Sequence, residues 1–167
     1  MRRGKLARLL TNLLSAPSLA ALCLFAVAFR IGPGPHLGWL LGEFGALVLL
    51  PGLTLAEAPW WPRTIGRRAR RLIAFGGSLA GYTTGLLAAW LGGAPPLLLA
   101  TALAYFLSTV ILALVNLFYK ASGHGCGVAG PLTAFFFLFH WLALPGLLLF
   151  PAVAWARRQL GAHTLPQ

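Results

Sequence analysis

The sequence predicts an all-α fold, a polytopic membrane protein with a bundle of about six transmembrane or membrane-embedded helices. Of the 167 residues, 59% are hydrophobic and only 9% are charged, and the mean hydropathy is +0.81. A water-soluble domain of this size could not cover its surface with so few charged residues. The apolar residues also form successive runs, several of them close to the ~20 residues that a helix needs to cross a bilayer.

The first two apolar runs follow a basic N-terminus. Four cations lie within Met1–Arg8, and the run Leu13–Phe29 predicts a first membrane helix. The segment Ala26-Val27-Ala28 resembles a signal-peptide cleavage site, so cleavage of this helix is the alternative. Leu37–Ala56 predicts a second span, which contains Glu43 and leads into aromatic residues suited to the headgroup layer.

The predicted second unit is a helical core over residues 63–167, after an N-terminal pair of membrane helices over residues 1–62. Within the last apolar run of this core, Pro145-Gly146 predicts a turn between two helices. The expected elements of the core are the spans Leu72–Leu91 and Leu97–Leu117, a turn at Gly92–Pro96, and two shorter arms within Pro131–Ala156.

The distribution of charge predicts how the chain is oriented. The formal charge of +11 arises because 13 Lys and Arg face only two carboxylates, Glu43 and Glu57. If the N-terminus is cytoplasmic and the spans alternate, every Lys and Arg except Arg30 lies on the cytoplasmic side, as the positive-inside rule requires. The cations need negative partners such as lipid headgroups or phosphorylated substrates. Nucleic acid is excluded as a partner, because the cations lie between hydrophobic spans.

The stretch Tyr119–Pro131 is the only one that gathers a cation, a hydroxyl, an imidazole and several glycines within a few residues. Lys120 supplies a positive charge, Ser122 a hydroxyl donor and His124 a titratable imidazole, and the glycines allow backbone amides to approach a ligand closely. This set suits an oxyanion, most plausibly phosphate. The alternative is a helix connection in which Lys120 only marks the water boundary.

Three segments resemble the motifs of the type 2 phosphatidic acid phosphatase and vanadium haloperoxidase superfamily, in particular its divergent small bacterial membrane members. Ala121-Ser122-Gly123-His124 is similar to the second motif, Pro-Ser-Gly-His. Ala156-Arg157, five residues, His163, three residues and Gln167 is similar to the third, Ser-Arg, five residues, His, three residues, Asp. The first motif, Lys, six residues, Arg-Pro, is matched loosely by Arg63, six residues and Arg70-Arg71.

The resemblance implies a membrane phosphatase of a bacterial inner membrane that hydrolyses a lipid or prenyl phosphate or diphosphate on the cytoplasmic side. It implies that His163 attacks phosphorus to form a phosphohistidine, and that His124 protonates the leaving oxygen. One histidine must then be neutral and the other protonated. The phosphate-binding set carried over or suggested by charge is Arg70, Lys120, Ser122, Gly123 and Arg157.

No metal or other cofactor is expected. Catalytic Mg²⁺ is held chiefly by carboxylates, and neither Glu43 within a span nor Glu57 near Trp60 is well placed for this.

The chain departs from the family pattern at the position that orients the nucleophile. The family places an aspartate where this chain has Gln167, and it also has a further helix after the third motif, so residues 63–167 are expected to lack the last helix of the core. Two alternatives therefore stay open. One is a catalytically inactive protein that binds anionic lipid or a partner helix, and the other is a small transporter. Without the motifs, the arginines would be interpreted as residues that only fix topology.

Overall fold

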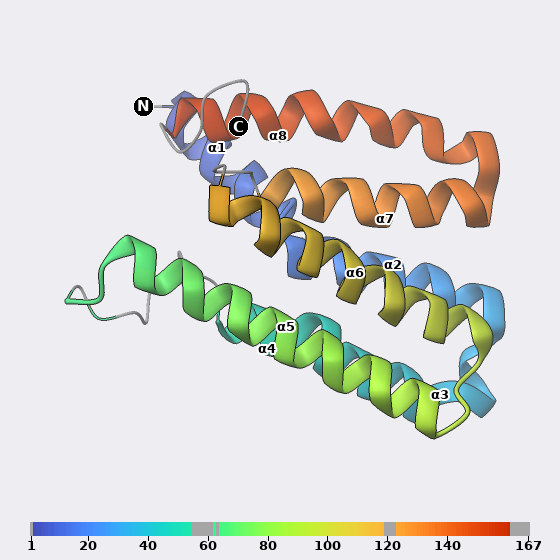
Figure 1. Cartoon of the computed structure of the whole chain (residues 1–167). Helices are drawn as coiled ribbons and strands as arrows, with labels where there is room; N and C mark the ends of the chain where they lie inside the picture. The colour runs from blue at the N-terminus through green and yellow to red at the C-terminus, as the bar shows by residue number, and fades with distance from the viewer. Residues whose placement is uncertain (1, 55–61, 63, 119–122, 161–167) are drawn as a thin grey trace.

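The computed structural model describes residues 2–54, 62, 64–118 and 123–160, and every regular element within them is helical. Figure 1 shows long helices that run back and forth along one axis, so that turns and chain ends gather at the two ends of the bundle. In chain order the helices are α1 Arg2–Leu13, α2 Ala16–Ile31, α3 Pro33–Phe44, the π-helix η1 Gly45–Leu49, α4 Leu50–Leu53, α5 Arg67–Leu91, α6 Pro96–Phe118, α7 Gly123–Phe139, the 3₁₀ helix η2 His140–Leu148, and α8 Leu149–Gln159.

The predicted first span, Leu13–Phe29, lies almost wholly within α2, and a bend of 44° separates α2 from α1 before it. Ser15 caps α2, since its hydroxyl accepts a hydrogen bond from the Ser18 N–H at 3.4 Å, and a proline follows at the start of the helix. Capping residues start a new helix rather than continue the old one. The apolar run therefore begins at Ala16 rather than at Leu13, and α1 is a separate basic helix.

The second span runs over Pro33–Leu53 and comprises α3, η1 and α4. Its π-helical turn is closed by the Leu50 N–H, which donates to the Gly45 carbonyl. Pro51 comes next and has no N–H to donate, and in a regular α-helix its ring would collide with the carbonyl of residue 47. The wider π turn relieves this conflict.

The third and fourth spans agree closely with the sequence. Candidate membrane spans cover Leu72–Leu91, within α5, and Pro96–Phe118, which is α6. The turn between them uses Gly93 at φ 70, a backbone conformation that glycine adopts without strain. The Ala94 N–H returns to the Ala89 carbonyl at 2.9 Å and closes the end of α5.

The last two helices form a hairpin, but the chain reverses earlier than the sequence predicted. Figure 1 shows α7 and α8 antiparallel. The helical path breaks at Phe139 (φ −128, ψ 3) and at His140, which has the left-handed φ of 53. Pro145 lies inside η2, so the predicted turn at Pro145-Gly146 is wrong. His140 lies within the last apolar run, so the sequence predicts that it faces the bundle, but the structure exposes it at this break.

Six full spans are not confirmed. Three helices are long and apolar enough to cross a membrane, or four if the bent pair α1 and α2 counts as one span. α7 contributes only a shorter apolar segment, Gly127–Phe136, and α8 has 11 residues.

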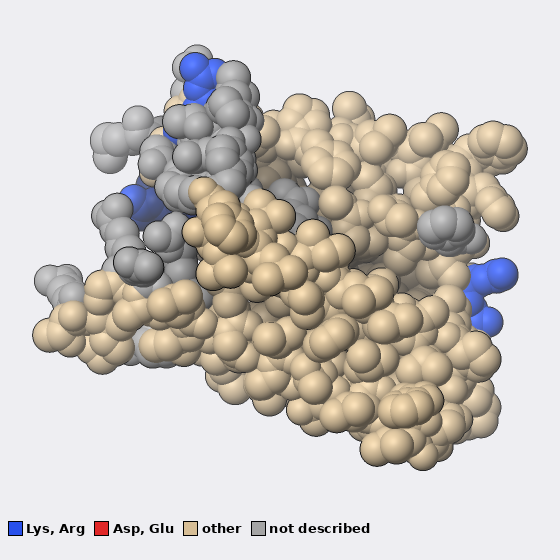
Figure 2. All heavy atoms as spheres, in the orientation of Figure 1, with Lys and Arg blue, Asp and Glu red and all other residues tan. Residues whose placement is uncertain are grey.

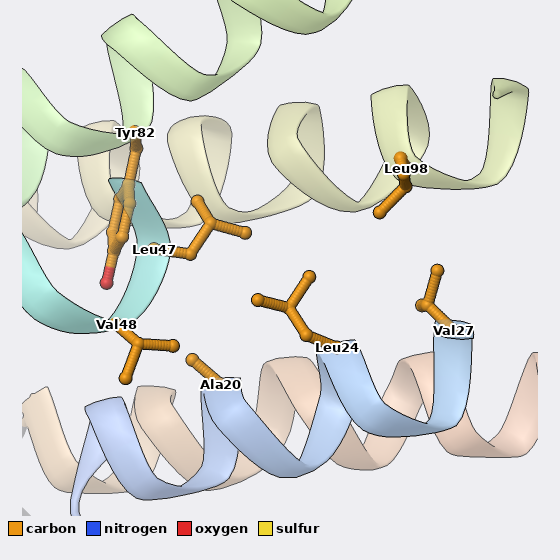
Figure 3. Packing of buried hydrophobic residues seen from close by; sticks show 7 residues of the cluster. All are labelled: Ala20, Leu24, Val27, Leu47, Val48, Tyr82 and Leu98. Carbon is orange, nitrogen blue, oxygen red and sulfur yellow. The ribbon is translucent and has the colours of Figure 1, made fainter. Parts of the chain in front are cut away.

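The principal core lies where α2 meets η1, α5 and α6 (Figure 3). Leu47 of η1 and Leu98 of α6 are fully buried, and Tyr82 of α5 lies at the end of the cluster next to Leu47 (Figure 3). Its other buried members, all from α2 and η1, are Ala20, Leu24, Val27 and Val48. A second, smaller cluster joins α2, α7 and α8 through Leu19, Val128 and Val153. The N-terminal helices thus pack against both halves of residues 63–167, and the division at residue 62 stays a prediction.

Glycines bring α5 unusually close to the α3–α4 span. A Cβ atom at Gly81 would overlap the carbonyl oxygen of Ala46, and one at Gly77 would overlap the side chain of Thr54. One turn further on, a Cβ at Gly85 would lie 2.9 Å from Oε2 of Glu43. Glycines four residues apart on one face permit such backbone contact between membrane helices. We call this contact the glycine layer.

Candidate functional site

The sequence-predicted site residues that the structure describes, which are Arg70, Gly123, His124 and Arg157, belong to helix ends at one end of the bundle. Figure 1 shows that the start of α5, the start of α7 and the end of α8 lie at the same end as α1, which carries Lys5 and Arg8. We call this the cationic end. In the view of Figure 2, Lys and Arg atoms are confined to the two ends, and the surface between them is free of both. The blue atoms at the opposite end lie where α2 ends, and the last turn of α2 contains Arg30.

The apolar surface between the ends fits a bilayer. Large side chains such as Phe25, Phe29 and Leu117 are 70–76% exposed along the helices. Trp90 and Trp141 are also exposed, near the end opposite to the cationic end. Tryptophan is enriched at membrane–water interfaces. The described helices are therefore compatible with insertion in a membrane.

The first turn of α7 contains Gly123 and His124. The first N–H groups of a helix have no intrahelical acceptor, and the helix dipole adds positive potential at this end, so a helix start favours an anion. α7 has no acidic residue in its first turn to occupy these donors. The orientation of the His124 imidazole is outside the part of the structure that is described.

Arg157 lies in the last turn of α8 and is only 6% exposed, whereas its neighbour Arg158 is exposed. α8 packs against α1 here, and Ala7 and Ala156 are both fully buried, so small side chains allow the two helices to approach closely. Burial of a guanidinium is costly unless it is compensated, so a residue placed only to fix topology would be expected to resemble Arg158.

Arg70 lies near the start of α5 and is half-buried. Its Nε–H donates a hydrogen bond of 2.7 Å to the Ile65 carbonyl. This bond holds the side chain against the turn that precedes α5. The guanidinium carries further N–H groups that a phosphate oxygen could accept from.

The remaining predicted site residues lie outside the described residues. These are Lys120, Ser122, His163 and Gln167. The convergence of the predicted catalytic and phosphate-binding side chains on one phosphate therefore stays a prediction.

Glu43 is buried in the glycine layer rather than at the cationic end. It is 2% exposed, and its Oε2 has no hydrogen-bond partner among the described residues. The missing side chain of Gly85 provides the space that the carboxyl group occupies. The sequence placed Glu43 within a span but did not predict that its carboxyl group lies against α5. The signal for this contact was the spacing of Gly77, Gly81 and Gly85.

Sequence reasoning also missed an apolar groove beside α7. Its volume is about 370 Å³, and α2, α7 and the η2–α8 arm line it. The signal in the sequence was the recurrence of bulky apolar residues every three or four positions along α7, which places them on one face of the helix.

No group of three or more His, Cys, Asp or Glu that could hold a metal is found within the described ranges. Comparison with protein-family models, with curated proteins and with solved structures gave no match to this chain.

Proposed function

We propose that the protein is a membrane phosphatase that hydrolyses a lipid or prenyl phosphate or diphosphate through a phosphohistidine intermediate. The observation that supports this most is the antiparallel arrangement of α7 and α8 (Figure 1). The segment ending at His124 and the segment starting at Arg157 resemble two motifs that must act on one phosphate. In the fold, the helix turns that carry His124 and Arg157 lie at the same end of the bundle.

The proposed reaction has two steps. A ring nitrogen of His163 attacks phosphorus, the bond from phosphorus to the leaving oxygen breaks, and His124 gives its proton to that oxygen. Water then attacks the phosphohistidine and gives a proton to His124, and the N–P bond breaks to release inorganic phosphate. With a diphosphate ester, the terminal phosphoryl group is transferred and the lipid monophosphate leaves.

The negative charge on the phosphoryl oxygens is stabilised by cationic side chains and backbone N–H groups. Arg157 and Arg70 donate from α8 and α5, and the Gly123 N–H adds the helix-terminal contribution of α7. Lys120 and Ser122 complete the set. Gln167 can hold the His163 ring through its amide carbonyl, without the full charge of a carboxylate.

The proposed location is a bacterial inner membrane, with the N-terminus and the cationic end on the cytoplasmic side. The charge asymmetry supports this orientation, since Arg30 is the one cation assigned to the opposite side.

The test is phosphate release by the purified full chain from phosphatidate, lysophosphatidate and a prenyl diphosphate dispersed in detergent. His163→Ala and His124→Ala should each abolish or strongly slow release. His36→Ala is the matched control, because His36 lies in the first turn of α3 at the opposite end of the bundle. Release that survives in His163→Ala would refute the histidine mechanism.

Gln167 favours a second candidate, a catalytically inactive protein that binds anionic lipid at the same end. The two functions differ in how they respond to Gln167→Asp. If orientation of His163 limits turnover, this substitution should raise the rate of phosphate release. A chain that binds phosphatidate but releases no phosphate from any of the three substrates, with Gln167 or with Asp, is the inactive form.

A further inference from the structure

The groove beside α7 has the form of a channel for a hydrocarbon chain. Its floor is one face of α7, formed by Val128, Leu132, Phe135 and Phe139, which follow one another at helical spacing. Leu22 of α2 stands on one side, and the η2–α8 arm closes the other, where Gly146 approaches the side chain of Leu132. The lining carries no charged or hydroxyl-bearing side chain.

The length of the groove matches the thickness of one leaflet. The α7 face from Val128 to Phe139 extends about 16 Å at 1.5 Å per residue, close to half of the ~30 Å hydrocarbon core of a bilayer. The groove starts about 7.5 Å along the axis from Gly123, by the same rise per residue. A phosphate at the start of α7 would therefore be separated from the groove by about the length of a lipid headgroup linkage.

The charge at the cationic end, next to the start of the groove, indicates what kind of molecule the groove binds. The cationic end carries Lys5, Arg8, Arg157 and Arg158, and Glu43, the one carboxylate among the described residues, lies in the glycine layer instead. A molecule that spans both regions needs an anionic head and an apolar tail. Phosphorylated lipids have this combination.

We propose that the groove binds one hydrocarbon chain of the phosphorylated lipid whose phosphate reacts at the start of α7; this assignment rests on the proposed function. One face of one helix accommodates a single chain, so any second chain lies outside in the bilayer. Bilayer hydrocarbon is as apolar as the groove, so the groove orients and selects the chain rather than drawing it out of water. It thereby holds the phosphate in register with His124 and Arg157.

The test compares a substrate that has a chain with one that lacks it, in two variants of α2. Leu22 lines the groove and is 48% exposed, so Leu22→Trp narrows the groove without enlarging a buried side chain. Phe25→Trp is the matched control, since Phe25 lies on α2 less than one turn away, is 72% exposed and does not line the groove. The substrates are long-chain lysophosphatidate and 4-nitrophenyl phosphate, in the same non-ionic detergent.

We expect Leu22→Trp to lower kcat/KM for lysophosphatidate about tenfold, the low end of what a change of hydrophobic pocket shape produces. Hydrolysis of 4-nitrophenyl phosphate should be unchanged, and Phe25→Trp should affect neither substrate. Equal losses for both substrates, or no loss for lysophosphatidate, would overturn the groove assignment while leaving the phosphatase proposal intact.

A second measurement does not depend on turnover. Lysophosphatidate with a photoreactive diazirine in its chain should label residues 128–139, unlabelled lysophosphatidate should compete, and neutral monoacylglycerol should not. Leu22→Trp should reduce the labelling. Labelling spread over all lipid-exposed helices, or equal competition by the neutral lipid, would show that the groove holds ordinary bilayer lipid and would overturn the proposal. Specific labelling without hydrolysis of any substrate would uphold the groove and refute the phosphatase.

Discussion

The helices pack differently in the glycine layer and around α7. In the glycine layer, α5 lies against the α3–α4 span because Gly77, Gly81 and Gly85 remove the side chains that would keep the backbones apart. Around α7, α2 and the η2–α8 arm also pack on the helix, through Leu19, Val128 and Val153, but the bulky apolar side chains between them leave a groove of about 370 Å³. Membrane helices gain little from the hydrophobic effect when they associate, so close backbone contact stabilises the first side, whereas the incomplete fit of large side chains along α7 leaves room for a ligand on the second.

The two sides also differ in the charge and position of their polar groups. The glycine layer encloses a single carboxyl group, that of Glu43, deep between helices. The groove side instead ends in cations, of which Arg157 is buried and Arg158 exposed. We therefore expect substitutions in the glycine layer to change the stability of the fold, and substitutions on the groove side to change the rate of hydrolysis.

The largest effect is expected at Arg157. Arg157→Ala should lower kcat for phosphate release by about 10²–10³-fold, as loss of a preorganised donor to the transition state does, and Arg157→Lys should retain part of the rate because it keeps the charge. The measurement is steady-state hydrolysis of lysophosphatidate, with the melting temperature in detergent as a check on folding. Arg158→Ala is the matched control in the same helix turn. Equal losses at both positions would mean that the arginines only fix topology.

The next effect is on stability and concerns Gly81. Gly81→Ala should destabilise the fold by about 1–3 kcal/mol, the range for overpacking, because its Cβ would overlap the Ala46 carbonyl and force α5 away from the span. Gly76→Ala is the control on the same helix, since a Cβ there meets nothing within 4 Å. Thermal or denaturant unfolding in one detergent compares the two. Similar stability for both variants would contradict the close contact in the glycine layer.

A smaller effect is expected at Glu43. The carboxyl group has a space beside Gly85 but no hydrogen bond to Oε2 among the described residues. Glu43→Gln, which keeps the shape, should therefore change the free energy of unfolding by less than about 1 kcal/mol, within the usual worth of one hydrogen bond, and should leave hydrolysis unchanged. A loss of activity, or a loss of stability well above this, would show that the carboxylate serves a ligand or partner.

The smallest effect is expected from chelation of metals. The proposed chemistry places charge stabilisation on Arg, Lys and backbone N–H groups, so EDTA should leave the rate of hydrolysis unchanged. Vanadate should inhibit, because its five-coordinate geometry resembles the transition state and it can bond to a histidine nitrogen. Activity that disappears in EDTA and returns with Mg²⁺ would contradict this chemistry.

The sequence predicted the parts of the fold that depend on long apolar runs. Leu72–Leu91 and the helix at Pro96–Phe118 were found almost to the residue, because length and hydropathy decide a span and Gly93 marks the turn. The break between α7 and η2 was misplaced, because Pro145 is tolerated within a 3₁₀ helix and the left-handed residue is His140, which no turn signal marks.

For the candidate site, the sequence predicts residue types and their chemical roles but not how the residues are packed. Motif spacing named Arg157, but its burial depends on how α1 packs against α8, two helices from opposite ends of the chain. The groove arises from the packing of α2 on α7, a contact that periodicity within either helix cannot reveal. The burial of Arg157 and the groove could not be predicted from the sequence, because both depend on packing between helices that are far apart in the chain.

The most direct test of the phosphatase account is the covalent intermediate. The full chain should be mixed with lysophosphatidate labelled in its phosphate, quenched within the first turnovers, and analysed by mass spectrometry under conditions that preserve phosphohistidine. We predict an acid-labile, alkali-stable phosphate on His163, which His163→Ala abolishes. His124→Ala should slow its formation most for poor leaving groups, since a good leaving group needs less protonation. Phosphate release by the active chain with no label on His163, or with the label on another residue, would contradict the account.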